Sequence, residues 1–426
     1  MAQEKGCGFF FKAHVSRRLM KRTTWFNVFV NAEGSAQLPD AKVRDALSSL
    51  DDELFELWNL GENVLLAWTH DGHELRFLKV RHYTIAEAIH GISRDPSSSD
   101  GAPDVINEVL AGSKYLPAGE FQQVCGMFRS EPHAFHVDFR AGREVDLELI
   151  DHLVRRYGVS LVRGRAVVLL DVVQFSLRSP LEQVAMLNSL AYSVNSAYRQ
   201  LLSKDIQVNF ARTTTGDGFY VWNRATTVDA NFALYKLMMM ILADNAVAQS
   251  KARGGWVPKL RAAFHVGEHY EFYQVEALNP TTFSYIVGQV TIDLSRMIAK
   301  ALPGQILLGD FGIEVGDTKT GRAIRYDTLD FVEKTAATLD QLSGLVVAGD
   351  CIDKIRCYLT GQRFGDGRYA VSRFHIRDKH GTARTVYNAK INIHRENAVP
   401  IFLGVQSKEL ADFSAERIEV MDRAAP

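Results

Sequence analysis

Two aspartates occupy positions at which a cation could be bound. Asp171 is predicted to end a buried strand, because RAVVLLDVV from Arg165 is a nearly continuous apolar run. Asp217 lies between two glycines at the tip of a predicted hairpin. A strand end and a hairpin tip of one sheet can bring two carboxylates together, and such hard oxygen donors suit Mg²⁺ or Mn²⁺. On its own, an aspartate at a strand end is usually a turn or cap residue, and Gly-Asp-Gly is first of all a tight turn.

The segment after Asp171 could contact phosphate. Gln174, Phe175 and Ser176 lead into a predicted helix, which opens on a capping box at SPLE from Ser179. The unpaired N–H groups and the positive dipole end of a helix N-terminus favour phosphate. An ordinary capped helix would show the same pattern, so this segment does not decide the function alone.

Strands and helices alternate around these residues. After the strand ending near Asp171 we expect a helix to about residue 203, a hairpin over 207–223, a helix over 229–250, a strand over 260–272, a helix over 290–301 and a strand over 305–310. This order predicts an α+β fold, a sandwich with a mixed, partly antiparallel sheet and helices. Earlier in the chain, residues 41–60 have the periodicity of an amphipathic helix, Asp71-Gly72 indicates a hairpin, residues 95–104 read as a polar loop, and 145–157 as a helix.

Six segments follow one another along the second half of the chain: DVVQFS at 171–176, TTTGDGFYV at 213–221, LRAAFHVGE at 260–268, YIVGQVTIDLSRM at 285–297, PGQILL at 303–308 and IRDKHGTARTVYNAKI at 376–391. In this order they resemble the catalytic domain of class III nucleotidyl cyclases. No single segment is specific, but their order and spacing together are. The resemblance implies a class III cyclase sandwich that closes a nucleoside triphosphate into a 3′,5′-cyclic nucleotide and pyrophosphate.

The resemblance also implies roles for individual residues. Asp171 and Asp217, with the backbone of Val172, would bind Mg²⁺ or Mn²⁺, two ions per active site. Arg296 would stabilise charge on the α-phosphate, and Lys379 would contact the triphosphate, although the alignment at Lys379 is looser. Without the surrounding pattern, Arg296 would be read as a helix-surface ion pair and Lys379 as a solvated turn lysine. The phosphate-binding segment would be Gln174, Phe175 and Ser176.

The sequence departs from the family at informative positions. Gln174 stands where the family has a glycine, which predicts a less permissive phosphate loop. Ile292 replaces the asparagine that acts in the transition state, and Asp293 would reach that place only with a shift of one residue. Ribose positioning must therefore come from elsewhere.

The residues at the base-reading positions match neither adenylate nor guanylate cyclases. They are Thr213, flanked by Arg212, and Tyr285. A tyrosine there would occupy the volume of a purine's second ring and could still bond or stack on a single-ring base. The chain is therefore similar to the pyrimidine cyclases of bacterial anti-phage (Pycsar) signalling, which make cUMP or cCMP for a separate cyclic-nucleotide-sensing effector. Two alternatives stay open: a purine cyclase with an atypical pocket, and a catalytically dead cyclase fold that binds nucleotide or a partner.

Length and composition set the remaining expectations. The 426 residues suggest an accessory or regulatory region at 1–155, a cyclase domain at 156–395 with an insertion at about 311–369, and a tail at 396–426. By resemblance, a single cyclase domain predicts a homodimer with active sites at the subunit interface. The net charge of −1 gives no basic field for nucleic acid, and no apolar run approaches the roughly 20 residues of a membrane helix. Four scattered cysteines suggest reduced thiols, so we expect a soluble, cytoplasmic protein.

Overall fold

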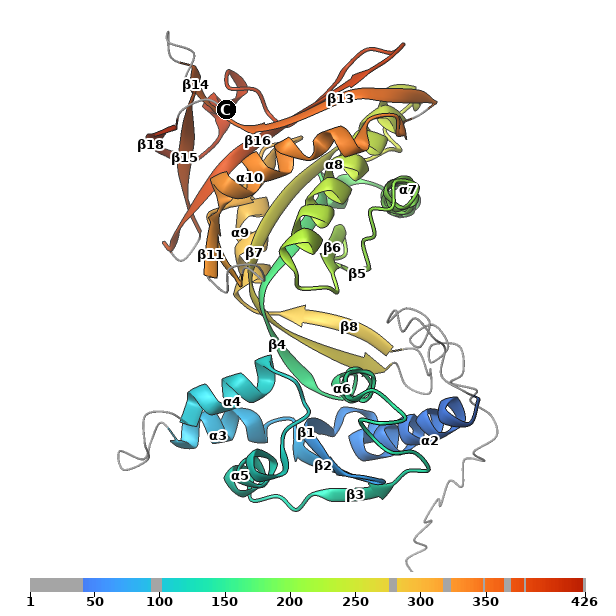
Figure 1. Cartoon of the computed structure of the whole chain (residues 1–426). Helices are drawn as coiled ribbons and strands as arrows, with labels where there is room; N and C mark the ends of the chain where they lie inside the picture. Colours follow the sequence, from blue (N-terminus) through green and yellow to red (C-terminus); the bar gives the residue numbers. More distant parts are fainter. Residues whose placement is uncertain are drawn as a thin grey trace, which may run out of the picture. The chain divides into compact units, whose positions relative to one another are not determined.

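The computed structural model describes residues 41–92, 102–275, 282–316, 323–347, 349–363, 369–378 and 381–423. The chain divides into two compact units (Figure 1). The first contains Met1–Val159 and Phe272–Phe283, and the second contains Ser160–Glu271 and Ser284–Pro426. Each unit is described by itself.

The first unit is built on a three-stranded antiparallel sheet in the order β1 (Asn63–Asp71), β2 (Glu74–Arg81) and β3 (His133–His136). The predicted hairpin is confirmed, since Asp71 pairs with Glu74 across the turn at Gly72. The helices of this unit are α2 (Ala41–Trp58), α3 (Thr84–Ile92), α4 (Ala102–Ala111), α5 (Ala118–Phe128) and α6 (Leu147–Arg155). Of the expected polar loop at 95–104, residues up to 101 lie outside the described residues and the rest begin α4.

The predicted amphipathic helix is α2, and its apolar stripe is buried. Leu47, Leu50, Leu54 and Leu57 pack in one core with Trp68 of β1 and other side chains. Residues at such three- and four-residue steps lie on one face of a helix, so the periodicity predicted both the element and its buried side.

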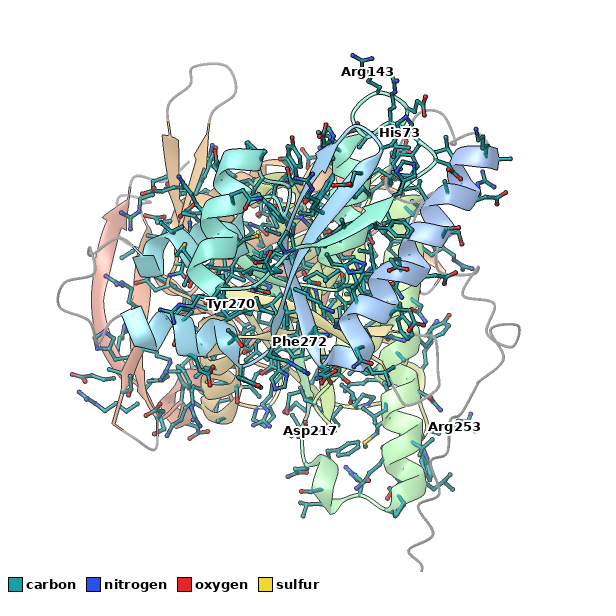
Figure 2. All side chains as sticks on the ribbon, turned by 90° about the horizontal axis from the view of Figure 1, so that it is seen from below. His73, Arg143, Asp217, Arg253, Tyr270 and Phe272 are labelled. Atoms are coloured by element: carbon teal, nitrogen blue, oxygen red, sulfur yellow. The ribbon has the colours of Figure 1, made fainter. Side chains whose placement is uncertain are left out.

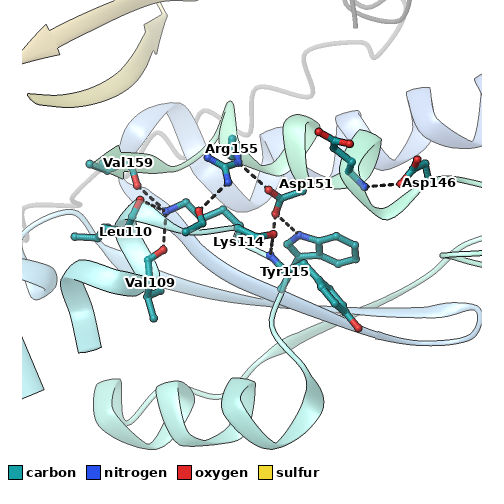
Figure 3. A network of polar contacts seen from close by, with 12 residues as sticks. Val109, Leu110, Lys114, Tyr115, Asp146, Asp151, Arg155 and Val159 are labelled. Atoms are coloured by element: carbon teal, nitrogen blue, oxygen red, sulfur yellow. Dashed lines mark hydrogen bonds and ion pairs between the residues drawn. The ribbon is translucent and has the colours of Figure 1, made fainter. Parts of the chain in front are cut away.

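A fully buried lysine joins several elements of the first unit (Figure 3). The ammonium of Lys114 donates to the carbonyl oxygens of Val109 (3.2 Å), Leu110 (3.3 Å) and Val159 (2.9 Å). Nearby, Arg155 donates to Asp151 at 2.7 Å and to the carbonyl of Gly112 at 2.7 Å. Lys114 thus satisfies carbonyl groups near the end of α4, where a helix leaves them without intrahelical partners.

The charge of Lys114 makes the stability of the first unit depend on pH. Burial, reinforced by the charge of Arg155 and opposed by Asp151, lowers the pKa of Lys114 from 10.5 to about 7. Between these two values the unfolded chain binds more protons than the folded one, so stability rises with pH. We expect wild type to gain roughly 2 kcal/mol relative to Lys114→Met between pH 7 and 9 in denaturant unfolding followed by tryptophan fluorescence. If the difference in the free energy of unfolding between wild type and Lys114→Met is the same at pH 7 and pH 9, Lys114 does not lose its charge in this range.

The second unit contains most of a large mixed sheet. Its main path runs in the order β12 (Val346–Val347), β13 (Asp350–Leu359), β16 (Ala383–Arg395), β9 (Ile306–Gly309), β7 (Leu260–Val275), β4 (Val159–Val172), β6 (Gly218–Asn223) and β5 (Phe210–Thr214). Five further strands branch from this path: β8 (Thr282–Val287), β14 (Gly361–Arg363), β15 (Tyr369–Arg377), β17 (Ile401–Leu403) and β18 (Glu416–Arg423). The β7–β9 pair is parallel, whereas β4–β6 and β9–β16 are antiparallel. The predicted α+β fold with a mixed, partly antiparallel sheet is confirmed.

Helices cover both faces of this sheet. Ala166, Val168 and Leu170 of β4 are buried in a core shared with α7 (Pro180–Leu202), α8 (Val228–Lys251) and α10 (Thr328–Ala337). Val167 and Leu169 are buried in a different core, shared with α9 (Gln289–Lys300). Successive side chains of a strand point to opposite faces, so a strand between two helical layers needs apolar residues throughout.

Residues 311–369 contribute to the same sheet and core. Phe331 of α10 and Ile352 of β13 are buried there, and β13 pairs antiparallel with β16. The strands β10 (Gly312–Gly316) and β11 (Ala323–Asp327) form a separate two-stranded sheet. The stretch in which the sequence suggests an insertion is therefore a structural part of the second unit.

Among the helices of the described ranges, none combines the length and the apolar character needed to cross a lipid bilayer.

Candidate active site

The hairpin of β5 and β6 brings Asp217 to the end of β4 (Figures 1 and 2). Asp171 pairs with Gly218 in the antiparallel register, and the N–H of Val172 donates to the carbonyl of Asp217 at 2.9 Å. A Cβ atom at Gly218 would lie 1.9 Å from the carbonyl oxygen of Leu170, and Gly216 has a φ of +97°. Both glycines of the turn are therefore required by the backbone.

Asp171 is a buried carboxylate with a nearby acidic neighbour. Its side chain is 9% exposed, and Arg261 of β7 donates to its Oδ2 atom from Nε at 2.8 Å and also from Nη2. Burial raises the pKa of Asp171 above its ordinary value, the bonds and charge of Arg261 oppose this shift, and Asp217 adds to it. Two carboxylates against one guanidinium leave a net negative charge, which favours a cation.

The donor set fits a hard divalent ion. It offers the carboxylate oxygens of Asp171 and Asp217, with the main chain of Val172 beside them. Within the described ranges, no group of three or more His, Cys, Asp or Glu side chains is arranged to hold a metal ion. Water and phosphate oxygens would therefore have to complete the coordination, as is usual where Mg²⁺ meets a nucleotide.

The loop after Asp171 has the conformation that a glycine would favour. Gln174 is exposed and has φ 57° and ψ 31°, in the left-handed region, although it carries a side chain. Phe175 packs against the core, and Ser176 is exposed. The predicted capping box is confirmed, since the N–H of Ser179 donates to Glu182 at 2.8 Å at the start of α7. A residue with a side chain therefore occupies the left-handed conformation that glycine adopts most readily.

Arg296 lies on α9 beside a carboxylate from another element. Its Nε atom is 3.7 Å from Oδ2 of Asp378, and its side chain is 31% exposed. Within the described part of the chain, Asp378 is its ion-pair partner, and no ion pair there joins Arg296 to Asp171 or Asp217. Lys379 lies outside the described residues.

Ile292 and Asp293 are neighbours on α9 but lie in different environments. Ile292 is 46% exposed. Asp293 instead accepts from Gln289 at 2.8 Å and from Arg384, and lies 3.7 Å from Nε2 of His265. Burial disfavours the charged form of Asp293, but the bonds from His265 and Arg384 lower its pKa below the ordinary value. Its carboxylate is thus fully engaged within the protein.

The candidate base-binding residues lie on different strands and faces. Thr213 and Arg212 are neighbours on β5, so their side chains point to opposite faces. Thr213 pairs with Tyr220, whose hydroxyl donates to the carbonyl of Thr291 on α9, whereas Arg212 lies over the ring of Phe219 at 5.1 Å. Tyr285, on β8, is half-buried beside the buried Ile286.

Sequence reasoning missed three charged residues of this region. Arg261 pairs with Asp171, while Arg384 bridges Asp293 and Asp378. A guanidinium among the apolar residues that open β7 (LRAAF) was the available signal for Arg261. Nothing in the sequence singled out the Arg384–Asp293 pair, because its members are 91 positions apart, and the shorter Asp378–Arg384 spacing has no periodic signal.

Comparison with known proteins gave matches only among solved structures. No family model and no curated protein matches the chain. The similar structures include adenylyl and guanylyl cyclases. One is the guanylate cyclase domain of RhGC from Catenaria anguillulae in complex with GTP, which is 12% identical, covers 56% of this chain and 100% of that domain, and has a TM-score of 0.31. Another is the adenylyl cyclase CyaB from P. aeruginosa, with 13% identity, coverage of 54% and 95%, and a TM-score of 0.29.

Proposed function

We propose that the chain is a class III nucleotidyl cyclase that converts a nucleoside triphosphate to its 3′,5′-cyclic monophosphate and pyrophosphate. The observation that carries this proposal is the convergence of Asp171 and Asp217 at the end of β4, next to a loop that leads into the N-terminus of α7. The order of the segments that resemble the family supports the same reading.

Each residue of this site has a chemical task in the proposed reaction. When bound at the two carboxylates, two divalent ions supply activation of the ribose 3′-hydroxyl and neutralisation of the leaving pyrophosphate. Arg261 holds Asp171 in place through bonds to a single oxygen, Oδ2. The main chain of Gln174, Phe175 and Ser176 would bind phosphate near the helix N-terminus.

We propose that a second copy of the chain completes the site. The resemblance places the arginine of one chain at the carboxylates of its partner, and the pairing of Arg296 with Asp378 within one chain is compatible with that arrangement. An apolar face beside the phosphate loop supports this arrangement, with exposed fractions of 76% for Leu177, 73% for Leu181, 56% for Val184 and 68% for Tyr192. An exposed stripe of this kind marks an interaction surface.

For the base, we propose that UTP or CTP is turned over at least tenfold faster than ATP or GTP, with UTP slightly favoured. The basis is Thr213 and Tyr285 in place of purine-reading residues, and a tenfold preference needs only about 1.4 kcal/mol in the transition state. Tyr285→Ala should lower pyrimidine turnover, and Tyr285→Phe should separate the contribution of the ring from that of the hydroxyl. A role in anti-phage signalling depends on this choice of base.

One experiment tests both the reaction and the base. The purified protein is incubated with each of the four ribonucleoside triphosphates and Mn²⁺, and the products are identified by mass. A product that is chiefly cyclic AMP or cyclic GMP would refute the pyrimidine choice and leave the cyclase in place. No cyclic product from any substrate would refute the cyclase and favour a nucleotide-binding module.

A further inference from the structure

Asp378 contacts both a turn of the main chain and two arginine side chains. Its Oδ1 atom accepts from the N–H of Thr382 at 3.0 Å, which closes the turn between β15 and β16. Its Oδ2 atom accepts from Nη1 of Arg384 at 2.9 Å and lies 3.7 Å from Nε of Arg296. The side chain is only 6% exposed, so these contacts replace water around a charged group.

The two arginines that share Asp378 differ in their freedom to meet a substrate. Arg384 is 16% exposed and is paired with two carboxylates, Asp293 and Asp378, so its charge is already balanced. Arg296 is 31% exposed and its contact with Asp378 is made by Nε. A guanidinium held through Nε still has its terminal nitrogens for a phosphate, because the donors of the fork point in different directions.

We propose that Asp378 is a positioning residue for Arg296 in the proposed reaction, anchored by Arg384 and by the turn at Thr382. The inference rests on the proposed function, because it assigns Arg296 to the α-phosphate. The 3.7 Å ion pair turns the Nε edge of the Arg296 guanidinium toward Asp378 and thereby orients the other edge.

This role has a kinetic consequence that a purely structural role lacks. The carboxylate of Asp378 repels a triphosphate, so its removal should leave ground-state binding of the substrate unchanged or tighter. The same removal releases Arg296 from the orientation in which it stabilises developing charge, so the chemical step should slow. A loss of kcat without a rise in KM is therefore the signature.

Asp378→Asn is the appropriate variant, since the amide keeps an oxygen to accept from Thr382 and loses the charge. We expect kcat to fall 10- to 100-fold with KM unchanged or lower. When Asp378→Asn is added to Arg296→Ala, kcat should fall little further, because the arginine that Asp378 would orient is already absent. The matched control is Asp310→Asn, which removes the carboxylate of the Arg373–Asp310 pair (2.8 Å) and should change kcat less than threefold.

A measurement without substrate separates this inference from the proposed function. The Nε–H resonance of Arg296, assigned by its loss in Arg296→Ala, should shift in Asp378→Asn and stay in place in Asp310→Asn. If wild type forms no cyclic nucleotide, the proposed function fails, and this resonance still decides whether Asp378 holds Arg296. The positioning role would be overturned if the Nε–H resonance of Arg296 does not move in Asp378→Asn. It would also be overturned if kcat of the double variant falls by the product of the two single-variant losses.

Discussion

In the proposed reaction, Asp217→Asn is expected to lower the rate of cyclic nucleotide formation at least about 1,000-fold, because it would remove a ligand of an essential cation. The contacts of Asp217 indicate that this substitution should leave the fold unchanged. The bond between Val172 and the hairpin uses the main-chain carbonyl of Asp217, and the amide of asparagine can still accept from the hydroxyl of Thr215, which donates to Oδ1 at 3.1 Å. The folded state should therefore be preserved while the charge is lost.

The matched control for this variant is Asp205→Asn. Asp205 is exposed and has a φ of 57°, a conformation that asparagine tolerates equally well. Pyrophosphate release with Mn²⁺ should stay within about twofold of wild type in the control, and both variants should unfold near the wild-type temperature. Turnover of Asp217→Asn within tenfold of wild type, with the metal still bound, would contradict the assignment of Asp217 as a metal ligand.

A loss of activity is harder to interpret when the substitution is made at Asp171. It is buried and pairs with Arg261, so Asp171→Asn would leave a partly buried guanidinium without its counter-charge. Loss of activity at Asp171 would then combine a missing metal ligand with a weakened fold. Asp217 is half-buried at a hairpin tip, so Asp217→Asn tests the metal ligand without weakening the fold.

The sequence predicted the parts of the site that depend on neighbouring elements. The β5–β6 hairpin pairs directly with β4. The apolar run before Asp171 and the glycines around Asp217 indicated that the two carboxylates could meet, and the resemblance to class III cyclases favoured this reading over two ordinary turns. The capping box of α7 and the stripe of α2 are likewise local patterns. The capping box and the stripe each follow from residues within a few turns of each other.

The sequence did not predict contacts that depend on the order of distant strands. β16 lies between β9 and β13, although more than seventy residues of chain separate it from β9. Arg384 meets Asp293 only because of this placement, and no periodicity in either segment encodes it. The left-handed conformation of Gln174 was also beyond sequence reasoning, since that region is uncommon for a residue with a side chain.

Mixing Asp217→Ala with Arg296→Ala should restore activity that neither variant has alone. If one chain supplies the carboxylates and its partner the arginine, a mixed dimer contains one site with both parts intact. Random exchange of equal amounts makes half of the dimers mixed, so about a quarter of wild-type activity is expected. The measurement is the rate of pyrophosphate release before and after subunit exchange, with exchange followed by mass.

A second mixture provides the control that makes this result specific. Asp171→Ala and Asp217→Ala both damage the carboxylate half of the site, so every site in their mixed dimer lacks one metal ligand. This mixture should stay inactive under the conditions that restore the first one. If both mixtures regain activity, the effect is one of dimer stability. If both stay inactive although subunit exchange is demonstrated, the arginine and the carboxylates of each site belong to one chain. In that case the exposed face around Leu181 and Tyr192 would need another partner.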